Sequence, residues 1–270
     1  MEARRFGLEA LSTGKTALHE FKLDDDFGWD DGLICGGRVA VLIIPNAEKY
    51  VDSFKMAVQK IEGALVFELE SGATQWVAKN DAEKKVLDSI CSRRELKTDS
   101  KFILPILFQE KLIIFGGGHI GQELAKVTSA IGFEVTIIDD RPEFVTEGRI
   151  PWATTRICEK PESYAKSLET NENTYLCLVT RGHRNDAKVL KELIQKPRAF
   201  LGMIGSKRKR EVVKKEMVAE GICTEQQFDL VRCPMGLDIG GETVQEIAIS
   251  IVAELVQVRA KSRGPIRARV

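Results

Sequence analysis

Apolar and polar residues alternate in blocks along the second half of the chain, and the blocks predict strands and helices in turn. The apolar runs predict strands near 112–115, 134–138, 153–157, 175–179 and 199–204. Apolar residues at helical spacing predict helices at about 120–131, 161–169, 186–195, 207–220 and 243–259. Such alternation is typical of a parallel sheet with helices on both faces. We therefore predict an α/β domain over residues 106–270.

The first hundred residues show a different pattern, with fewer helices and strands that follow one another directly. They predict a helix at 2–11, strands at 16–23 and 39–44, a helix at about 47–61, and strands near 64–70 and 74–78. A charged stretch (80–101) and the run FILPILF then lead into the second domain. We predict a smaller α+β domain over residues 1–105.

Composition excludes several classes of partner and location. The 270 residues are 43% hydrophobic and 30% charged, with 40 basic and 40 acidic side chains, so no nucleic-acid partner is expected. No apolar run approaches the roughly 18–20 residues that cross a bilayer, and the N-terminus lacks the apolar core of a signal peptide. We expect a cytoplasmic protein. Its six cysteines form no CxxC pair, which favours free thiols and no protein-built metal site.

A glycine-rich turn, GGGHIG, follows the first predicted strand of the second domain and opens a helix. Gly116 would allow a sharp turn, Gly118 would leave room for a diphosphate, and Gly121 would let the helix pack closely. Asp139 follows the second strand, where dinucleotide-binding folds place the carboxylate that binds a ribose 2′-OH. The motif predicts a Rossmann-like half-fold. A glycine turn that binds nothing is the alternative.

Other candidate ligand-binding residues follow the later strands, whose carboxyl ends should converge on one crevice. They are Thr180, Arg181 and His183 in the loop TRGHRND, and Gly205, Ser206 and Lys207 after the fifth strand. Hydroxyls, glycine N–H groups and arginines together suit a phosphate or another anion. The plainer alternatives are a hydrophilic turn with Asp186 as an N-cap, a helix cap at Ser206 and a solvated Lys207.

Four further residues have two interpretations each. His119 either faces a ligand or packs against the sheet, and Asp238 in PMGLDIGG either touches a ligand or braces its turn. Arg141 either favours a 2′-phosphate or pairs with Glu143. Cys35 in LICGG is either a buried structural thiol or an accessible sulfur that can touch a metal centre. No catalytic residue is assigned.

Together these motifs resemble the xanthine dehydrogenase accessory (XdhC/CoxI-type) maturation factors. The matching pieces, spread over residues 33–255, are LICGGRVAVLIIP, KLIIFGGGHIGQELAKVTSAIGFEVTIIDDRPEF, YLCLVTRGHRNDAKVL, FLGMIGSKRKR and PMGLDIGGETVQEIAISIVAEL. The resemblance implies a small N-terminal domain, a C-terminal Rossmann domain and a bound molybdenum cofactor, as molybdopterin or its dinucleotide form. It also implies delivery to a xanthine dehydrogenase-like molybdenum hydroxylase apoenzyme, a homodimer, and a cysteine desulfurase as a further partner.

The chain departs from the family pattern at its start. Family members usually begin with a longer segment that contains a GSxPRxxGxxM-like stretch and a GGCxE-like turn, whereas this sequence starts at MEAR, just after that turn. We therefore expect the first strands of the N-terminal domain to be absent.

Two other interpretations of function are open beside the delivery of a molybdenum cofactor. An NAD(P)-dependent oxidoreductase explains the glycine turn and Asp139 equally well. The sequence, however, shows no evident set of residues for hydride transfer. A nucleotide-sensing regulatory module needs only the Rossmann half and leaves LICGG unused. We expect a cofactor-insertion chaperone rather than a turnover enzyme.

Overall fold

The computed structural model describes residues 2–23, 37–52, 55, 62–69, 71, 73–92, 95–106 and 110–262. Contacts between residues divide the chain into two units. One unit contains residues 1–108 with 262–270, and the other contains residues 109–261. Each unit is described by itself.

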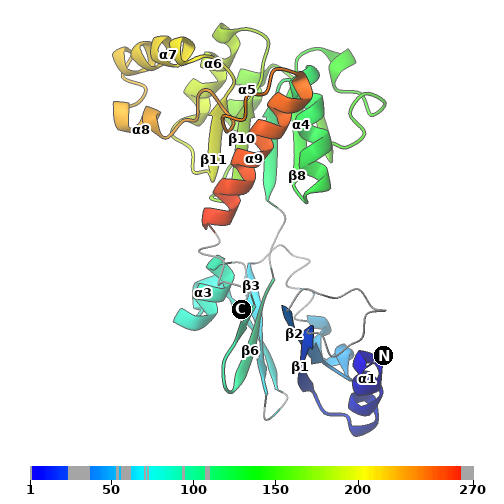
Figure 1. Cartoon of the computed structure of the whole chain (residues 1–270). Helices are drawn as coiled ribbons and strands as arrows, with labels where there is room; N and C mark the ends of the chain where they lie inside the picture. The colour runs from blue at the N-terminus through cyan, green and yellow to red at the C-terminus, as the bar shows by residue number, and fades with distance from the viewer. Residues whose placement is uncertain are drawn as a thin grey trace. The chain divides into compact units, whose positions relative to one another are not determined.

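The second unit is built on a sheet of five parallel strands (Figure 1). The strands are β7 (Lys111–Phe115), β8 (Glu134–Asp139), β9 (Thr155–Cys158), β10 (Thr174–Leu178) and β11 (Phe200–Met203). Their order across the sheet is β11-β10-β7-β8-β9. The predicted Rossmann-like parallel sheet is confirmed, and each strand lies within two residues of its predicted bounds.

Helices cover both faces of this sheet, as predicted. They are α4 (His119–Ala130), α5 (Pro161–Ser167), α6 (His183–Leu193), α7 (Lys207–Ala219), α8 (Glu225–Asp229) and α9 (Val244–Ser262). Alternate strand residues point to opposite faces, so β7 contributes to two hydrophobic cores. Leu112 and Ile114 pack with residues of α4 and α9, while Ile113 and Phe115 pack with residues of α5, α6 and α7.

The strand order fixes where a ligand can bind. The chain runs outward from β7 through β8 to β9, and then returns to the other side of β7 for β10 and β11. The loops after β7 and β10 therefore leave the sheet in opposite directions. In open α/β sheets, the crevice at such a reversal is where ligands bind.

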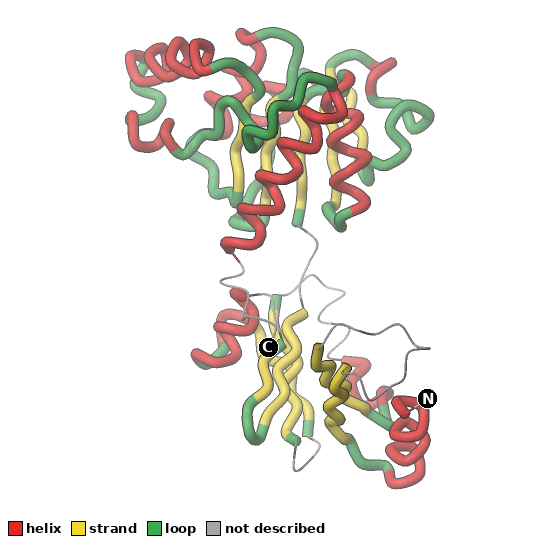
Figure 2. The backbone as a smooth tube through the Cα atoms, viewed as in Figure 1, coloured by secondary structure: helices red, strands yellow, loops and turns green. Residues whose placement is uncertain are grey.

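The first unit contains an antiparallel sheet of order β4-β3-β6-β5 and a separate two-stranded ribbon (Figure 2). The sheet consists of β3 (Gly63–Glu68), β4 (Thr74–Ala78), β5 (Leu96–Lys97) and β6 (Lys101–Ile106), and the ribbon of β1 (Ala17–Leu23) and β2 (Gly37–Ile43). The described helices are α1 (Glu2–Thr13), α3 (Lys84–Ser92), and the 3-10 turns η2 (Ala47–Tyr50) and η3 (Lys79–Asp81). This mixed composition confirms a smaller unit that contains both helices and strands.

The sequence prediction missed several elements here, and α3 and β6 are the longest of them. The charged stretch contains α3, which buries Val86 and Ile90 one helical turn apart. The run FILPILF forms most of β6, although Pro105 cannot donate a backbone hydrogen bond. The strand tolerates this proline because β5 pairs only with Phe102 and Ile103. The helix expected at 47–61 begins as η2, and much of the remaining range lies outside the described residues.

Two findings on the described residues bear on the class of protein. None of their helices is long and apolar enough to cross a membrane. Their cysteines, Cys91, Cys158, Cys177, Cys223 and Cys233, are free thiols.

Candidate functional site

The glycine turn after β7 has the backbone geometry that its sequence predicts. Gly116 has a φ of +121°, and a Cβ atom there would lie 2.4 Å from the carbonyl oxygen of Val179. At Gly121 a Cβ would lie 1.9 Å from the carbonyl oxygen of Gly116, so only glycine lets the helix start this close to the strand. A Cβ on Gly118 would meet nothing within 4 Å. Gly116 and Gly121 thus allow close packing of the backbone, whereas Gly118 faces open space.

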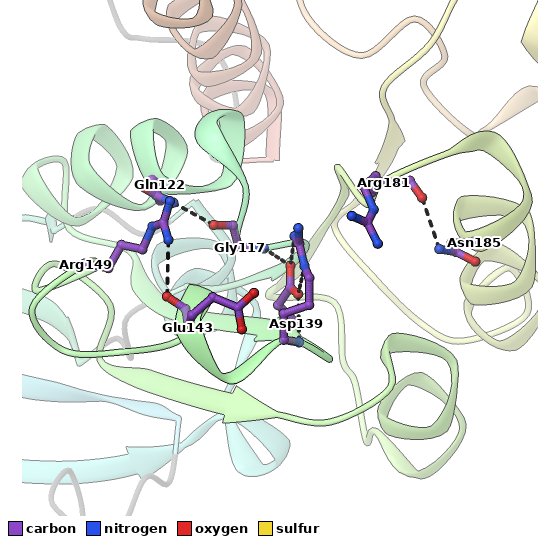
Figure 3. Close-up of polar contacts among 8 residues, drawn as sticks. Gly117, Gln122, Asp139, Glu143, Arg149, Arg181 and Asn185 are labelled. Carbon is purple, nitrogen blue, oxygen red and sulfur yellow. Dashed lines mark hydrogen bonds and ion pairs between the residues drawn. The ribbon is translucent and has the colours of Figure 1, made fainter.

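The N-terminus of α4 is available for an anion. Gly118 is its N-cap residue, and no side chain caps the helix. The first N–H groups of a helix have no partner within it, and they carry the positive end of the helix dipole. The turn itself is fixed from both sides, because Gln122 Nε2 donates to Gly117 O at 2.8 Å and Gly117 N donates to Asp139 Oδ2 at 2.8 Å (Figure 3).

Asp139 ends β8 and is 4% exposed. Its Oδ1 accepts hydrogen bonds from Arg141 N (3.0 Å) and Arg141 Nε (2.8 Å), and its Oδ2 accepts from Gly117 N and from Arg141 Nη2 (2.9 Å). Burial by itself would raise the pKa of this carboxyl, but the hydrogen bonds from Arg141 and Gly117 outweigh it and hold the pKa below its usual value. Asp139 is therefore an ionised carboxylate with a fixed partner, and Arg141 pairs with it rather than with Glu143.

A polar pocket of about 110 Å³ lies at the switch point between the loops. It is lined by Gly116, Asp139, Asp140, Arg141, Lys160, Pro161, Glu162, Thr180, Arg181 and Asn185. Pockets that enclose a whole drug-sized ligand measure about 300–1,000 Å³, so this one suits a single polar group of a larger ligand. Its charged lining is mixed: three cations face three carboxylates, and Arg141 already neutralises Asp139.

Arg181 contributes a cation from the β10 side of this pocket. Its side chain is exposed, and its guanidinium points toward the side of the crevice that holds Asp139 (Figure 3). Its backbone carbonyl accepts a hydrogen bond from Asn185 Nδ2 at 3.0 Å, which fixes the start of the loop. Arg181 is thus positioned to bind an anion that enters the pocket.

A buried ion pair connects the loops after β10 and β11. Asp186 is 1% exposed, and its Oδ1 accepts hydrogen bonds from Thr180 N (3.1 Å) and Thr180 Oγ1 (2.6 Å). Its Oδ2 accepts from Lys209 Nζ at 2.5 Å, and Lys209 Nζ also donates to Ile204 O at 2.7 Å. Burial raises the pKa of Asp186, and the hydrogen bonds from Lys209 and Thr180 offset only part of that effect. Asp186 is therefore not a simple helix cap, because its carboxylate holds Thr180 in place through two hydrogen bonds.

Two of the three predicted residues after β11, Ser206 and Gly205, have structural roles. Ser206 Oγ accepts a hydrogen bond from Lys209 N at 3.2 Å and so caps α7. A Cβ on Gly205 would lie 2.5 Å from Lys209 Cδ, so the glycine gives Lys209 space to reach Asp186. Lys207 is exposed to solvent.

The structure brings together only some of the predicted site residues. Gly116, Asp139, Thr180 and Arg181 line the pocket. Gly118, Gly121 and the three residues after β11 are outside its lining, and so are His119 and Asp238. The side chain of His183 and all of Cys35 lie outside the described residues. Ligand-binding roles of His119, Asp238, His183 and Cys35 stay predictions.

Sequence reasoning missed Lys160 and Asn185, which line the pocket, and Lys209, which braces it. Lys160 follows the third strand, and Asn185 lies in TRGHRND. The rule that ligands bind beyond the carboxyl ends of strands could have found both. Lys209 gives no such signal, because it lies three residues inside a helix among other basic residues.

Among the described residues, no group of three or more His, Cys, Asp and Glu side chains is arranged to hold a metal ion. The hydrogen-bond donors around the site are backbone N–H groups, the Thr180 hydroxyl, and guanidinium and ammonium groups. These donors bind oxygen atoms of anions.

Two curated proteins resemble this chain in sequence. The chain is 29% identical over 166 residues to Escherichia coli (strain K12) YqeB, described as an uncharacterized protein; that alignment covers 61% of this chain and 30% of YqeB. It is also 25% identical over 262 residues to a Bacillus subtilis (strain 168) protein described as part of a probable xanthine dehydrogenase, and this alignment covers 90% of this chain and 76% of that protein.

A solved structure shares the fold. A crystal structure described as a xanthine dehydrogenase from Bacillus halodurans superposes with a TM-score of 0.76 at 21% identity, and the match covers 100% of this chain and 82% of that one. The model of the XdhC Rossmann domain family matches residues 112–255, more than half of the chain. The chain therefore belongs to the XdhC family.

Proposed function

We propose that this protein binds the molybdenum cofactor and delivers it to a xanthine dehydrogenase-like molybdenum hydroxylase. Membership of the XdhC family supports the broader role in xanthine dehydrogenase maturation. The Bacillus subtilis relative, described as part of a probable xanthine dehydrogenase, supports this class of partner. The cofactor, in the form of molybdopterin or its dinucleotide, carries a phosphate or a diphosphate.

The observation that carries the proposal is the anion-ready crevice at the switch point. The uncapped N-terminus of α4 offers free N–H groups beside Gly118, where the absent Cβ leaves open space. Arg181 supplies a cation to the neighbouring pocket, which Gly116 of the same glycine turn also lines. These donors fit the phosphate end of a pterin cofactor. The chain would bind and orient that end, while the molybdenum centre supplies its chemistry in the recipient enzyme.

An NAD(P)-dependent oxidoreductase is the second candidate, and the same glycine turn favours it. A dinucleotide diphosphate would use the same backbone groups. The state of Asp139 counts against an NAD ligand, because protein donors fill all the positions at which its carboxylate would accept a ribose hydroxyl. This observation ranks an NAD-dependent enzyme below the cofactor carrier.

The test is to purify the full chain from a host that makes molybdenum cofactor, oxidise it and measure pterin fluorescence. We expect near-equimolar pterin for the wild type and a loss of most of it for Gly118→Ala, since a methyl group would occupy the open space. Gly148→Ala is the matched control, because its added Cβ also meets nothing and Gly148 lies between η4 and β9 rather than at the N-terminus of α4. It should retain the pterin.

Delivery is measured separately, by adding the loaded chain to a cofactor-free molybdenum hydroxylase and following the appearance of activity. We expect activation by the wild type and none by Gly118→Ala. Absence of pterin, together with dinucleotide-dependent reduction of a substrate, would overturn the proposal in favour of the oxidoreductase. A Cys35→Ala variant that loads and transfers normally would remove that thiol from the proposed mechanism.

A further inference from the structure

The carboxylate of Asp139 has no acceptor position left for a ligand. A carboxylate has about four lone-pair positions, and four protein donors occupy them, two on each oxygen. Three of these four donors belong to Arg141. In NAD-binding folds the equivalent acid binds the ribose 2′-OH. Here a ribose diol could bind Asp139 only by displacing Arg141.

Arg141 is held firmly in this position. Its guanidinium lies over the ring of Phe144, with Cζ 3.6 Å from the ring centroid, and its side chain is 23% exposed. The hydrogen bond to Asp139 is the largest effect on Arg141 and raises its pKa further above the usual value. Arg149 lies over the same ring at 4.1 Å and donates to Glu143 O at 3.3 Å. Phe144 thus stacks with two guanidinium groups.

Arg141 can bind a phosphate while it remains on Asp139. A guanidinium has five N–H donors, and the bidentate contact with Asp139 uses only Nε and one N–H of Nη2. Arg141 lines the same pocket as Arg181, so a group bound there has both side chains as neighbours. A phosphoryl group beyond β8 would therefore gain charge-assisted hydrogen bonds. A neutral diol would gain none from Asp139.

We infer that Arg141 is a specificity-determining residue, which makes the crevice beyond β8 select a ligand with a phosphate at that place over one with a free ribose diol. The inference concerns discrimination between ligands that share the diphosphate site, and it does not depend on the identity of the cofactor that the protein carries. NADPH and NADH are suitable probes, because they differ only by a phosphate on the ribose.

The experiment titrates the full chain with NADPH and with NADH and follows nucleotide fluorescence. We expect the wild type to bind NADPH at least about tenfold more tightly than NADH, the loss expected for one strong charged contact. Arg141→Ala removes the phosphate ligand and exposes the acceptors of Asp139. This variant should lose NADPH affinity and gain NADH affinity, so that the preference reverses.

Two further variants separate the effects of charge and occupancy. Arg141→Gln can keep a hydrogen bond to Asp139 without the charge, so it should lose NADPH affinity without gaining NADH affinity. Arg149→Ala removes a guanidinium from the same phenylalanine without freeing Asp139, so it should retain the wild-type preference. Both variants also keep the test decisive if Arg141→Ala fails to fold.

The inference is overturned if the wild type binds NADH as tightly as NADPH, or if Arg141→Ala leaves their ratio unchanged. A wild-type chain that binds neither nucleotide overturns it as well. None of these outcomes affects the pterin content of the purified protein, so the failure of this inference and the failure of the proposed function are distinguishable.

Discussion

Two carboxylate–cation pairs flank the switch point of the sheet, and they differ in how completely the protein encloses them. Asp139 and Arg141 connect the loops after β7 and β8, while Asp186 and Lys209 connect the loops after β10 and β11. In the first pair the cation is 23% exposed and lines the pocket. In the second pair the cation is 16% exposed and the acid 1%.

The two acids respond to burial in opposite ways. Hydrogen bonds outweigh burial at Asp139 and lower its pKa, whereas burial outweighs the hydrogen bonds at Asp186 and raises its pKa. Arg141 also has donors to spare, while Lys209 directs its ammonium to Asp186 and to the Ile204 carbonyl. The comparison indicates that the Asp139–Arg141 pair can contact a ligand. The Asp186–Lys209 pair instead holds the loop that carries Thr180 and Arg181.

The largest expected effect comes from breaking the buried pair. Lys209→Met leaves the carboxylate of Asp186 buried without its cation, which typically costs about 3–5 kcal/mol. We expect the free energy of unfolding in urea to fall by about 3 kcal/mol. Lys207→Met is the matched control, since Lys207 is an exposed lysine two residues away, and it should change stability by less than about 0.5 kcal/mol. Equal effects of the two variants would show that the Asp186–Lys209 pair does not support the fold.

A smaller effect is expected at the other pair. Arg141→Ala removes two of the four hydrogen bonds to Asp139, but the backbone N–H groups of Gly117 and of residue 141 remain, and water can reach this side of the pocket. We expect a loss of about 1 kcal/mol in the free energy of unfolding, the usual net value of a polar contact. A loss of stability as large as that of Lys209→Met would contradict the view that water or a ligand can replace the contact of Arg141 with Asp139.

The sequence predicted the positions of both acids but not their partners. Asp139 was found because a glycine turn and a second strand set its distance from Gly116, and Asp186 because it lies in the loop that follows a strand. Lys209 was missed because helical periodicity does not show that a lysine folds back toward the preceding loop. The pairing of Arg141 with Asp139, two residues away, depends on side-chain direction, which the pattern leaves open.

A weak local signal explains why the sequence analysis missed helix α8. The short helix α8 begins with a capping box of Thr224 and Gln227, a signal that was present in the sequence but is too short to predict an element alone. The equivalent signal before α9, Thr243 with Glu246, precedes a long run of apolar residues at helical spacing, and that helix was predicted. A capping motif was therefore predictive where apolar residues at helical spacing continued for several turns after it.

The smallest and most specific prediction concerns pH. The folded pKa of Asp139 is lowered, so its ionised form stabilises the fold above the unfolded pKa of about 3.9, and this contribution is lost as the pH falls through the folded value. The folded pKa of Asp186 is raised, so its contribution is complete below about pH 3.9 and declines as the pH rises through the folded value. The two contributions therefore change in opposite directions with pH.

Asp139→Asn and Asp186→Asn separate these contributions when urea unfolding is measured between about pH 3.5 and 7. The destabilisation caused by Asp139→Asn should grow as the pH rises, because the wild type gains the stabilising carboxylate that the variant lacks. The destabilisation caused by Asp186→Asn should shrink over the same range, because the wild type then bears the cost of a buried charge. Parallel pH profiles for the two variants would show that the two acids share one environment, and would remove the physical basis for assigning ligand contact to the Asp139–Arg141 pair and a structural role to the Asp186–Lys209 pair.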